Sequence, residues 1–208
     1  MSGAKRLAIY GGSFSPPHMG HVLAARAYLA LTEADKLVIM PAKRPPHKLL
    51  DGMVDDDVRI EMCRLAFSED AELSCKCEVS EWEISRDAVS YTVDTVEHFR
   101  SSGYEDICLL IGTDMLLTFE SWYRYKDLFK YVTLCYIDRY DEERAETLIV
   151  AERFRREYGA RILSLDAPVF DVSSSEIRDR ISRGESIHGL VPDKVEEYII
   201  ENSLYKRA

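Results

Sequence analysis

The residues best suited to chemistry lie in one short segment near the N-terminus, Gly11 to His21, which reads GGSFSPPHMGH. Two adjacent glycines let the backbone turn sharply and approach a ligand closely. His18 and His21 are three residues apart, so on a helical turn they share a face. Gly20 between them removes a side chain that would block a phosphate. Imidazoles with pKa values near about 6.5 serve as cations or as neutral donors beside a polyphosphate.

A second candidate segment, Val172 to Arg178, reads VSSSEIR. Ser173 followed by Glu176 three residues later is the pattern of a capping box at a helix start. The amides and hydroxyls that follow, with Arg178 about one turn further on, form a set that would grip a phosphate. A well-capped surface helix explains this segment equally well, so both interpretations stay open on the residues alone.

The chain shows no nucleophile motif of the G-x-S-x-G or H-E-x-x-H type and no convincing Cys–His pair. Phosphoryl or nucleotidyl transfer needs none, because a phosphate monoester is largely a dianion at neutral pH and attacks directly. Positioning and charge stabilisation then supply most of the catalysis. The metal would be Mg²⁺ held mainly by phosphates and water. We expect no protein metal site, since Cys75 and Cys77 lack zinc-knuckle spacing.

The candidate segments must be positioned by an alternation of apolar strands and amphipathic helices. The sequence predicts strands over Lys5–Tyr10, Lys36–Met40, 73–84, Ile107–Ile111, Val132–Ile137 and Arg161–Leu165. It predicts helices over His18–Leu31, from Asp55–Asp57 onward, Tyr91–Arg100, Ser121–Lys130, Glu142–Tyr158, 174–183 and 192–202. We place Leu148, Ala151 and Phe154 on the inward face of the fifth helix. Such alternation indicates an α/β, Rossmann-like, doubly wound parallel sheet with helices on both faces.

Length and composition narrow the class of protein. The 208 residues fit one domain, 1–208, with the C-terminal helices, about 172–208, packed on the sheet. The net charge of −10 argues against a nucleic-acid partner. No apolar run has membrane-spanning length, and the five cysteines without an export signal favour reduced thiols in a cytoplasmic protein.

Taken together, these segments resemble the bacterial nicotinate-nucleotide adenylyltransferases, within the nucleotidyltransferase superfamily marked by H-x-G-H. The resemblance covers nearly the whole chain. His18–His21 and Ser173–Arg178 match motifs shared with related transferases. More specific to the nicotinate branch are Pro45–Lys48, Ser90–Thr95, Gly112-Thr113-Asp114, Trp122, and Val191-Pro192 with Tyr198-Ile199.

The resemblance implies adenylyl transfer from ATP to nicotinate mononucleotide, with Mg²⁺ as cofactor and roles for the matching residues. His18, His21 and Arg178 would be catalytic. The implied ATP-binding residues are Gly11, Gly12, Ser13, Phe14, His18, His21, Gly112, Asp114, Ser174 and Arg178. The implied mononucleotide-binding residues are Lys48, Thr92, Trp122 and Tyr123.

Each role has a simpler rival: Trp122 as a core aromatic, Lys48 as a solvated loop lysine, and Asp114 or Thr92 as residues of a helix start. Ser15 stands where the family more often has Asp or Asn. The family often has Arg-Pro-Gly after the fifth strand, and of these three residues this sequence has only the arginine, Arg139. Nicotinamide mononucleotide as substrate, dual specificity, or an inactive nucleotide-binding regulator remain alternatives, and a homo-oligomer stays open.

Overall fold

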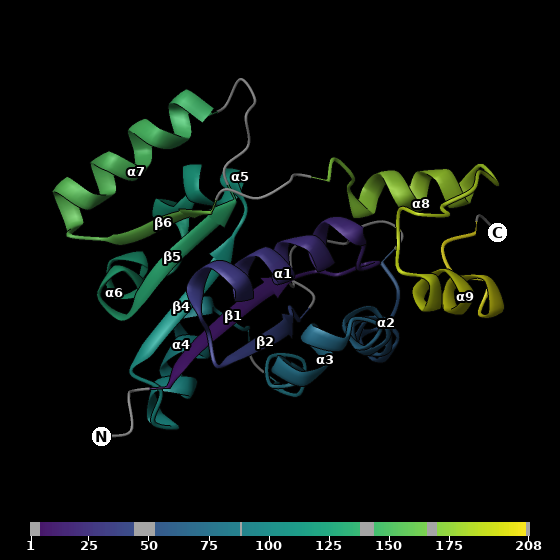
Figure 1. The fold of residues 1–208 in the computed structure, drawn as a ribbon, viewed down its shortest axis with the longest axis horizontal. Coiled ribbons are helices and arrows are strands. Elements are labelled where there is room, and N and C mark those ends of the chain that lie inside the picture. The colour runs from purple at the N-terminus through teal and green to yellow at the C-terminus, as the bar shows by residue number, and fades with distance from the viewer. Residues whose placement is uncertain (1–4, 44–52, 88, 138–143, 166–169, 207–208) are drawn as a thin grey trace.

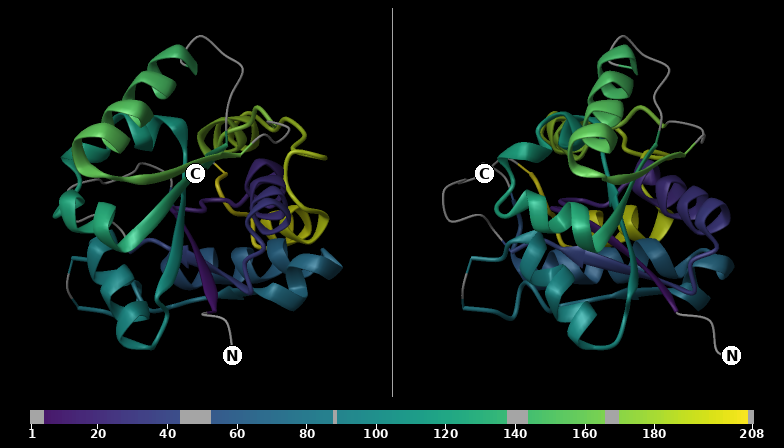
Figure 2. Two further views of the ribbon diagram at one scale, coloured as in Figure 1. Left: turned by 60° about the vertical axis from the view of Figure 1, so that its left-hand side comes forward. Right: turned by 90° about the vertical axis from the view of Figure 1, so that its left-hand side faces the viewer.

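The computed structural model describes residues 5–43, 53–87, 89–137, 144–165 and 170–206, and these form one parallel sheet with helices on both faces (Figures 1 and 2). The strands are β1 (Arg6–Gly12), β2 (Lys36–Pro41), β3 (Cys77–Val79), β4 (Asp106–Ile111), β5 (Val132–Ile137) and β6 (Arg161–Leu165). Their order across the sheet is β3-β2-β1-β4-β5-β6. The predicted fold class is therefore confirmed.

Alternate residues of β1, β2, β4 and β5 enter two separate hydrophobic clusters. Ala8 of β1 lies in one cluster, whereas its neighbours Leu7 and Ile9 lie in the other. The first cluster is covered by α1 (Met19–Thr32), α2 (Asp56–Ser68), α3 (Ala71–Lys76), α8 (Ser174–Ser182) and α9 (Asp193–Glu201). The second is covered by α4 (Thr92–Ser101), α5 (Thr113–Leu117), α6 (Tyr125–Tyr131) and α7 (Arg144–Tyr158). Burial on both faces explains the continuous apolar runs of the central strands.

The strand order changes direction at β1. Chain connections lead from β1 to β2 on one side, and the chain later returns to place β4 on the other side. Ligands of open α/β sheets bind outside the carboxyl ends of the strands at such a switch point. The turn after β1 and the turn after β4 therefore define the place to look for a site.

Three sequence predictions were wrong in detail. Residues 73–84 are mostly not a strand: α3 occupies the first part, and only Cys77–Val79 pair with β2. The helix predicted over Ser121–Lys130 is broken, with a 3₁₀ turn at Phe119–Ser121 and α6 starting at Tyr125, because Arg124 adopts a left-handed φ of 54°. No helix was predicted between Ile111 and Ser121, although Asp114 was considered as a residue of a helix start, and α5 occupies part of that stretch.

The predicted inward face of α7 was partly wrong. Ala151 and Phe154 are fully buried, whereas Leu148 is 43% exposed and Thr147 takes its place in the interior. The C-terminal helices sit on the first cluster, through Ile177 of α8 and Val195 and Ile199 of α9. None of the helices in the described ranges has the length and apolar character needed to cross a membrane.

Candidate active site

The turn between β1 and α1 brings the two histidines into direct contact. His18 is the N-cap of α1, and His21 lies three residues into the helix. Their rings stack with centroids 3.6 Å apart and an angle of 30° between planes. The backbone N–H of His18 donates to Nδ1 of His21 at 3.1 Å. A neutral His21 therefore carries its proton on Nε2, because Nδ1 is the acceptor.

Both imidazoles are held neutral. Burial lowers the pKa of His18 to about 4. Burial, and secondarily the proximity of His18, lowers the pKa of His21 well below its usual value. Desolvation disfavours the charged form of a histidine, and two adjacent rings cannot both ionise cheaply. Both shifts favour neutral rings that act as N–H donors over the cationic form that the sequence left open.

Packing beneath the histidines comes from Phe14. Its ring is fully buried, 4.9 Å from the ring of His21 and 5.5 Å from that of Tyr10. A side chain at Gly12 would place its Cβ 3.0 Å from this ring, so only glycine fits there without displacing it. Phe14 thus packs beneath the site in the core, and its buried ring lines neither of the two pockets described below.

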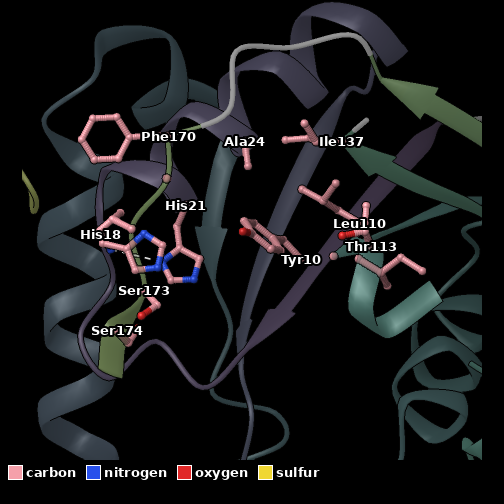
Figure 3. Close-up of a pocket in the computed structure, with 14 residues that line it drawn as sticks. Tyr10, His18, His21, Ala24, Leu110, Thr113, Ile137, Phe170, Ser173 and Ser174 are labelled. Atoms are coloured by element: carbon pink, nitrogen blue, oxygen red, sulfur yellow. Dashed lines mark hydrogen bonds between the residues drawn. The ribbon is translucent and has the colours of Figure 1, made fainter. Parts of the chain in front are cut away.

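A pocket of about 280 Å³ opens over the histidines (Figure 3). Its walls come from the first turn of α1, the ends of β4 and β5, and the segment that leads into α8. The lining residues include Tyr10, His18, His21, Gly112, Thr113, Phe170, Ser173 and Ser174. In Figure 3 the two histidine rings and the hydroxyls of Ser173 and Ser174 lie on the same side of this space. We call it the histidine pocket.

The start of α8 is tied to the turn that precedes the histidines. Ser173 caps the helix by accepting from the N–H of Glu176 at 3.1 Å, which is the first half of the predicted capping box. The hydroxyl of Ser174 donates to the carbonyl of Pro16 at 2.8 Å. Arg178 donates to the carbonyl of Ser15 at 2.8 Å and to Ser175 at 3.1 Å. These bonds fix the two predicted phosphate segments against each other.

A second pocket, of about 200 Å³, lies on the other side of the end of β4. It is lined by Gly11, Gly12 and Ser13 after β1, by Met40 and Ala42 at β2, and by Glu83, Thr92, Thr95, Met115 and Trp122. Leu110 and Ile111 line both pockets, so the two spaces adjoin across one strand end. We call it the tryptophan pocket.

Glu83 is the acidic group that lines the tryptophan pocket within the described ranges. Its carboxylate accepts a hydrogen bond from the hydroxyl of Thr95 at 2.5 Å. Burial is the main cause that raises the pKa of Glu83, partly offset by this bond and by Arg86. Glu83 was not predicted as a site residue, whereas Thr95 is the last residue of the Ser90–Thr95 segment, which was.

The predicted site residues divide between the two pockets. Gly11, Gly12 and Ser13, predicted to serve ATP, line the tryptophan pocket, whereas Gly112 and Ser174 line the histidine pocket. Arg178 lines neither pocket, and its guanidinium donates to the carbonyl of Ser15.

Of the remaining predicted residues, Asp114 is exposed in the first turn of α5. Thr92 and Trp122 lie together as predicted for a mononucleotide site. Tyr123 is 54% exposed and its ring packs on Tyr91 at 4.4 Å, outside the lining of either pocket. Lys48, with the rest of Pro45–Lys48, and Arg139 lie outside the described residues.

Comparison with known proteins agrees with this architecture. Residues 9–180 match the family model described as cytidylyltransferase-like, which defines the chain as a nucleotidyltransferase-type protein. A protein of Caldicellulosiruptor saccharolyticus named probable nicotinate-nucleotide adenylyltransferase is 35% identical over 203 residues, covering 97% of this chain and 99% of its own. One of the same name from Thermotoga maritima is 36% identical over 93% of this chain and 90% of its own. The chain belongs to the nicotinate-nucleotide adenylyltransferase family.

Solved structures share the fold at lower identity. The nicotinic acid mononucleotide adenylyltransferase of Plasmodium falciparum, complexed with NaAD, aligns with a TM-score of 0.76 at 20% identity, over 97% of both chains. A putative nicotinate-nucleotide adenylyltransferase of Vibrio parahaemolyticus aligns with a TM-score of 0.68 at 20% identity, over 98% of this chain and 97% of that one. At this identity the likeness shows a common architecture.

Proposed function

We propose that this chain transfers the adenylyl group of ATP to nicotinate mononucleotide, forming nicotinate adenine dinucleotide and pyrophosphate. The observation that carries the proposal is the pair of pockets that adjoin at Leu110 and Ile111. Joining two nucleotides requires two binding spaces that meet where the bond forms. The names of the relatives at about 35% identity over the full length support the identity of the two substrates.

In this proposal the histidine pocket binds ATP. The Nε2–H of His21, the ring of His18 and the start of α8 at Ser174 line the same space and would donate to phosphate oxygens. A donor aimed at charge that develops during the reaction stabilises the transition state more than the ground state. The mononucleotide phosphate attacks the α-phosphorus, and pyrophosphate leaves. In the free protein Arg178 donates to the carbonyl of Ser15. In this proposal its guanidinium turns to the ATP phosphates when ATP binds.

In the same proposal the tryptophan pocket binds nicotinate mononucleotide. The indole of Trp122 offers a flat face for stacking of the pyridine ring. Backbone amides at the start of α4, near Thr92, are suited to an anionic carboxylate because they lie at the positive end of a helix. Lys48 is proposed to reach substrate phosphate and Asp114 the adenosine ribose, as the family resemblance implies.

The residues that line the histidine pocket are compatible with a Mg²⁺ ion that binds together with ATP. Among the described residues, the lining of the histidine pocket contains no carboxylate, so oxygen ligands for a metal would come from phosphates and water. Such an ion would neutralise charge on the leaving pyrophosphate. The protein's own part is to hold the phosphates with neutral donors and backbone amides.

Pyrophosphate release tests the proposal directly. The purified chain is supplied with ATP and Mg²⁺, together with nicotinate mononucleotide or with nicotinamide mononucleotide at matched concentration. A strong preference for the nicotinate form is expected. Equal use of both would keep the chemistry and change the assignment to dual specificity. No release with either, despite ATP binding, would favour an inactive nucleotide-binding regulator or another H-x-G-H transferase.

A further inference from the structure

Arg59 of α2 is a fully buried cation that the chemistry described above does not use. Its guanidinium donates to the carbonyl of Ser13 at 2.7 Å and to the carbonyl of Ala42 at 2.8 Å. It also pairs with Asp56 one turn earlier in the helix, at 2.6 Å. A buried charge is retained only when its partners are fixed in place, because the cost of desolvation is high.

The two carbonyls belong to different strands of the sheet. Ser13 follows β1 and Ala42 follows β2, and both residues line the tryptophan pocket. Neither lines the histidine pocket. A direct backbone bond, from the N–H of Ala42 to the carbonyl of Gly12 at 2.8 Å, holds the same two strand ends together. Arg59 thus bonds two residues that line the tryptophan pocket and none that lines the histidine pocket.

The turn that Arg59 holds is conformationally strained. Phe14, directly after Ser13, adopts a φ of 45°, which is unfavourable for a residue other than glycine. A strained backbone persists only where surrounding contacts enforce it. The bond from Arg59 to the Ser13 carbonyl fixes the peptide that leads into Phe14.

We propose that Arg59 is a positioning residue that sets the shape of the mononucleotide pocket by clamping the backbone after β1 to the backbone after β2. A guanidinium suits this task because its donors lie in one plane at fixed angles, so that a single side chain holds two carbonyls and a carboxylate. A lysine ammonium keeps the charge but has neither the reach nor the fork. The kinetic part of the proposal rests on the assignment of the tryptophan pocket to the mononucleotide.

The test compares Arg59→Lys with the matched control Arg64→Lys, an exposed arginine of the same helix that pairs with Glu61 and Glu81. In Arg59→Lys we expect the KM for nicotinate mononucleotide to rise about tenfold, as for loss of a hydrogen bond from a charged group, with the KM for ATP changed by less than about twofold. Arg64→Lys should behave as wild type. Arg59→Met, which removes the charge, should show a larger rise in the same KM.

Hydrogen exchange provides a readout that does not depend on activity. In Arg59→Lys, amides of residues 11–15 and of Ala42 and Lys43 should exchange faster than in wild type, whereas those of 173–178 should keep their protection. Equal rises in both KM values, or uniform loss of protection, would assign Arg59 to general stability and overturn the proposal. If wild type releases no pyrophosphate, the proposed function fails, and the exchange pattern alone decides whether Arg59 clamps the two strand ends.

Discussion

The backbone N–H of His18 donates to Nδ1 of His21, and this bond fixes which nitrogen of His21 carries the proton. The N-cap position of α1 would otherwise leave this N–H without a partner, as the first amides of helices are. One interaction therefore completes the helix start and presents the Nε2–H of His21 as a donor.

Replacement of His21 by alanine should lower turnover by about two to three orders of magnitude, the loss typical of a donor that stabilises developing charge. His188→Ala is the matched control, because His188 is an exposed histidine whose side chain is 78% accessible. Turnover by pyrophosphate release and folding by circular dichroism check the expectation. A folded His21→Ala protein with near-normal turnover would remove His21 from the reaction.

The depressed pKa values of the histidines make stability depend on pH. His18 has a pKa of about 4 when folded and an ordinary value near about 6.5 when unfolded, so the unfolded chain binds more protons between these values. This contribution to stability is complete above about pH 6.5 and is lost as the pH falls toward 4, with a slope of at most about 1.4 kcal/mol per pH unit. His21 acts in the same direction.

Urea unfolding at pH 7 and pH 5 tests this expectation with wild type and His18→Gln. The glutamine is neutral at both values, so the variant should lose less stability between them than wild type does. Equal losses in the two proteins would mean that His18 titrates normally in the folded state.

Gly20→Ala should impair the histidine pocket without unfolding the protein. The new Cβ would lie 3.0 Å from Nδ1 of His18 and 3.2 Å from the carbonyl oxygen of Phe170, so the ring or the segment before α8 must shift. Alanine favours a helix by up to about 1 kcal/mol over glycine, which offsets part of the strain. We expect a similar melting temperature with a raised KM for ATP and a lower kcat.

Trp122→Ala should weaken binding of the mononucleotide far more than binding of ATP, because Trp122 lines only the tryptophan pocket. Its ring also packs on Phe119 at 4.9 Å, so some stability will be lost. Trp122→Phe keeps an aromatic face and should recover much of the affinity. Calorimetric titration with each ligand measures the two affinities separately. Equal weakening of both affinities would mean that Trp122 acts only as a core aromatic.

The sequence predicted the central strands well because their residues are buried on both faces and form continuous apolar runs. It predicted β3 poorly because three residues at a sheet edge carry no such run. The helix predicted near Trp122 is divided because Arg124 adopts a left-handed backbone conformation. An arginine in the sequence does not indicate such a conformation. These differences follow from tertiary packing and not from local preference.

The site was predicted by residue type but not by geometry. The spacing of His18 and His21 indicated a shared face, but not that the rings stack or that burial lowers both of their pKa values. The turn after β1 was assigned to ATP, but its glycines face the other pocket. Arg59 was not among the predicted residues, since no local pattern shows that α2 turns it inward.

The register between β1 and β4 places Leu7 beside Ile107, one hundred positions apart in the chain. During synthesis at about 5–20 residues per second, β1 would wait roughly 5–20 seconds for this partner. In that interval β2 already can cover one side of β1, while the other edge offers unpaired backbone groups to any strand nearby. The sheet that forms the two adjoining pockets is thus completed only when β4 pairs with β1, a late contact between distant parts of the chain. Slowed translation before residue 107 should therefore favour aggregation of the nascent chain.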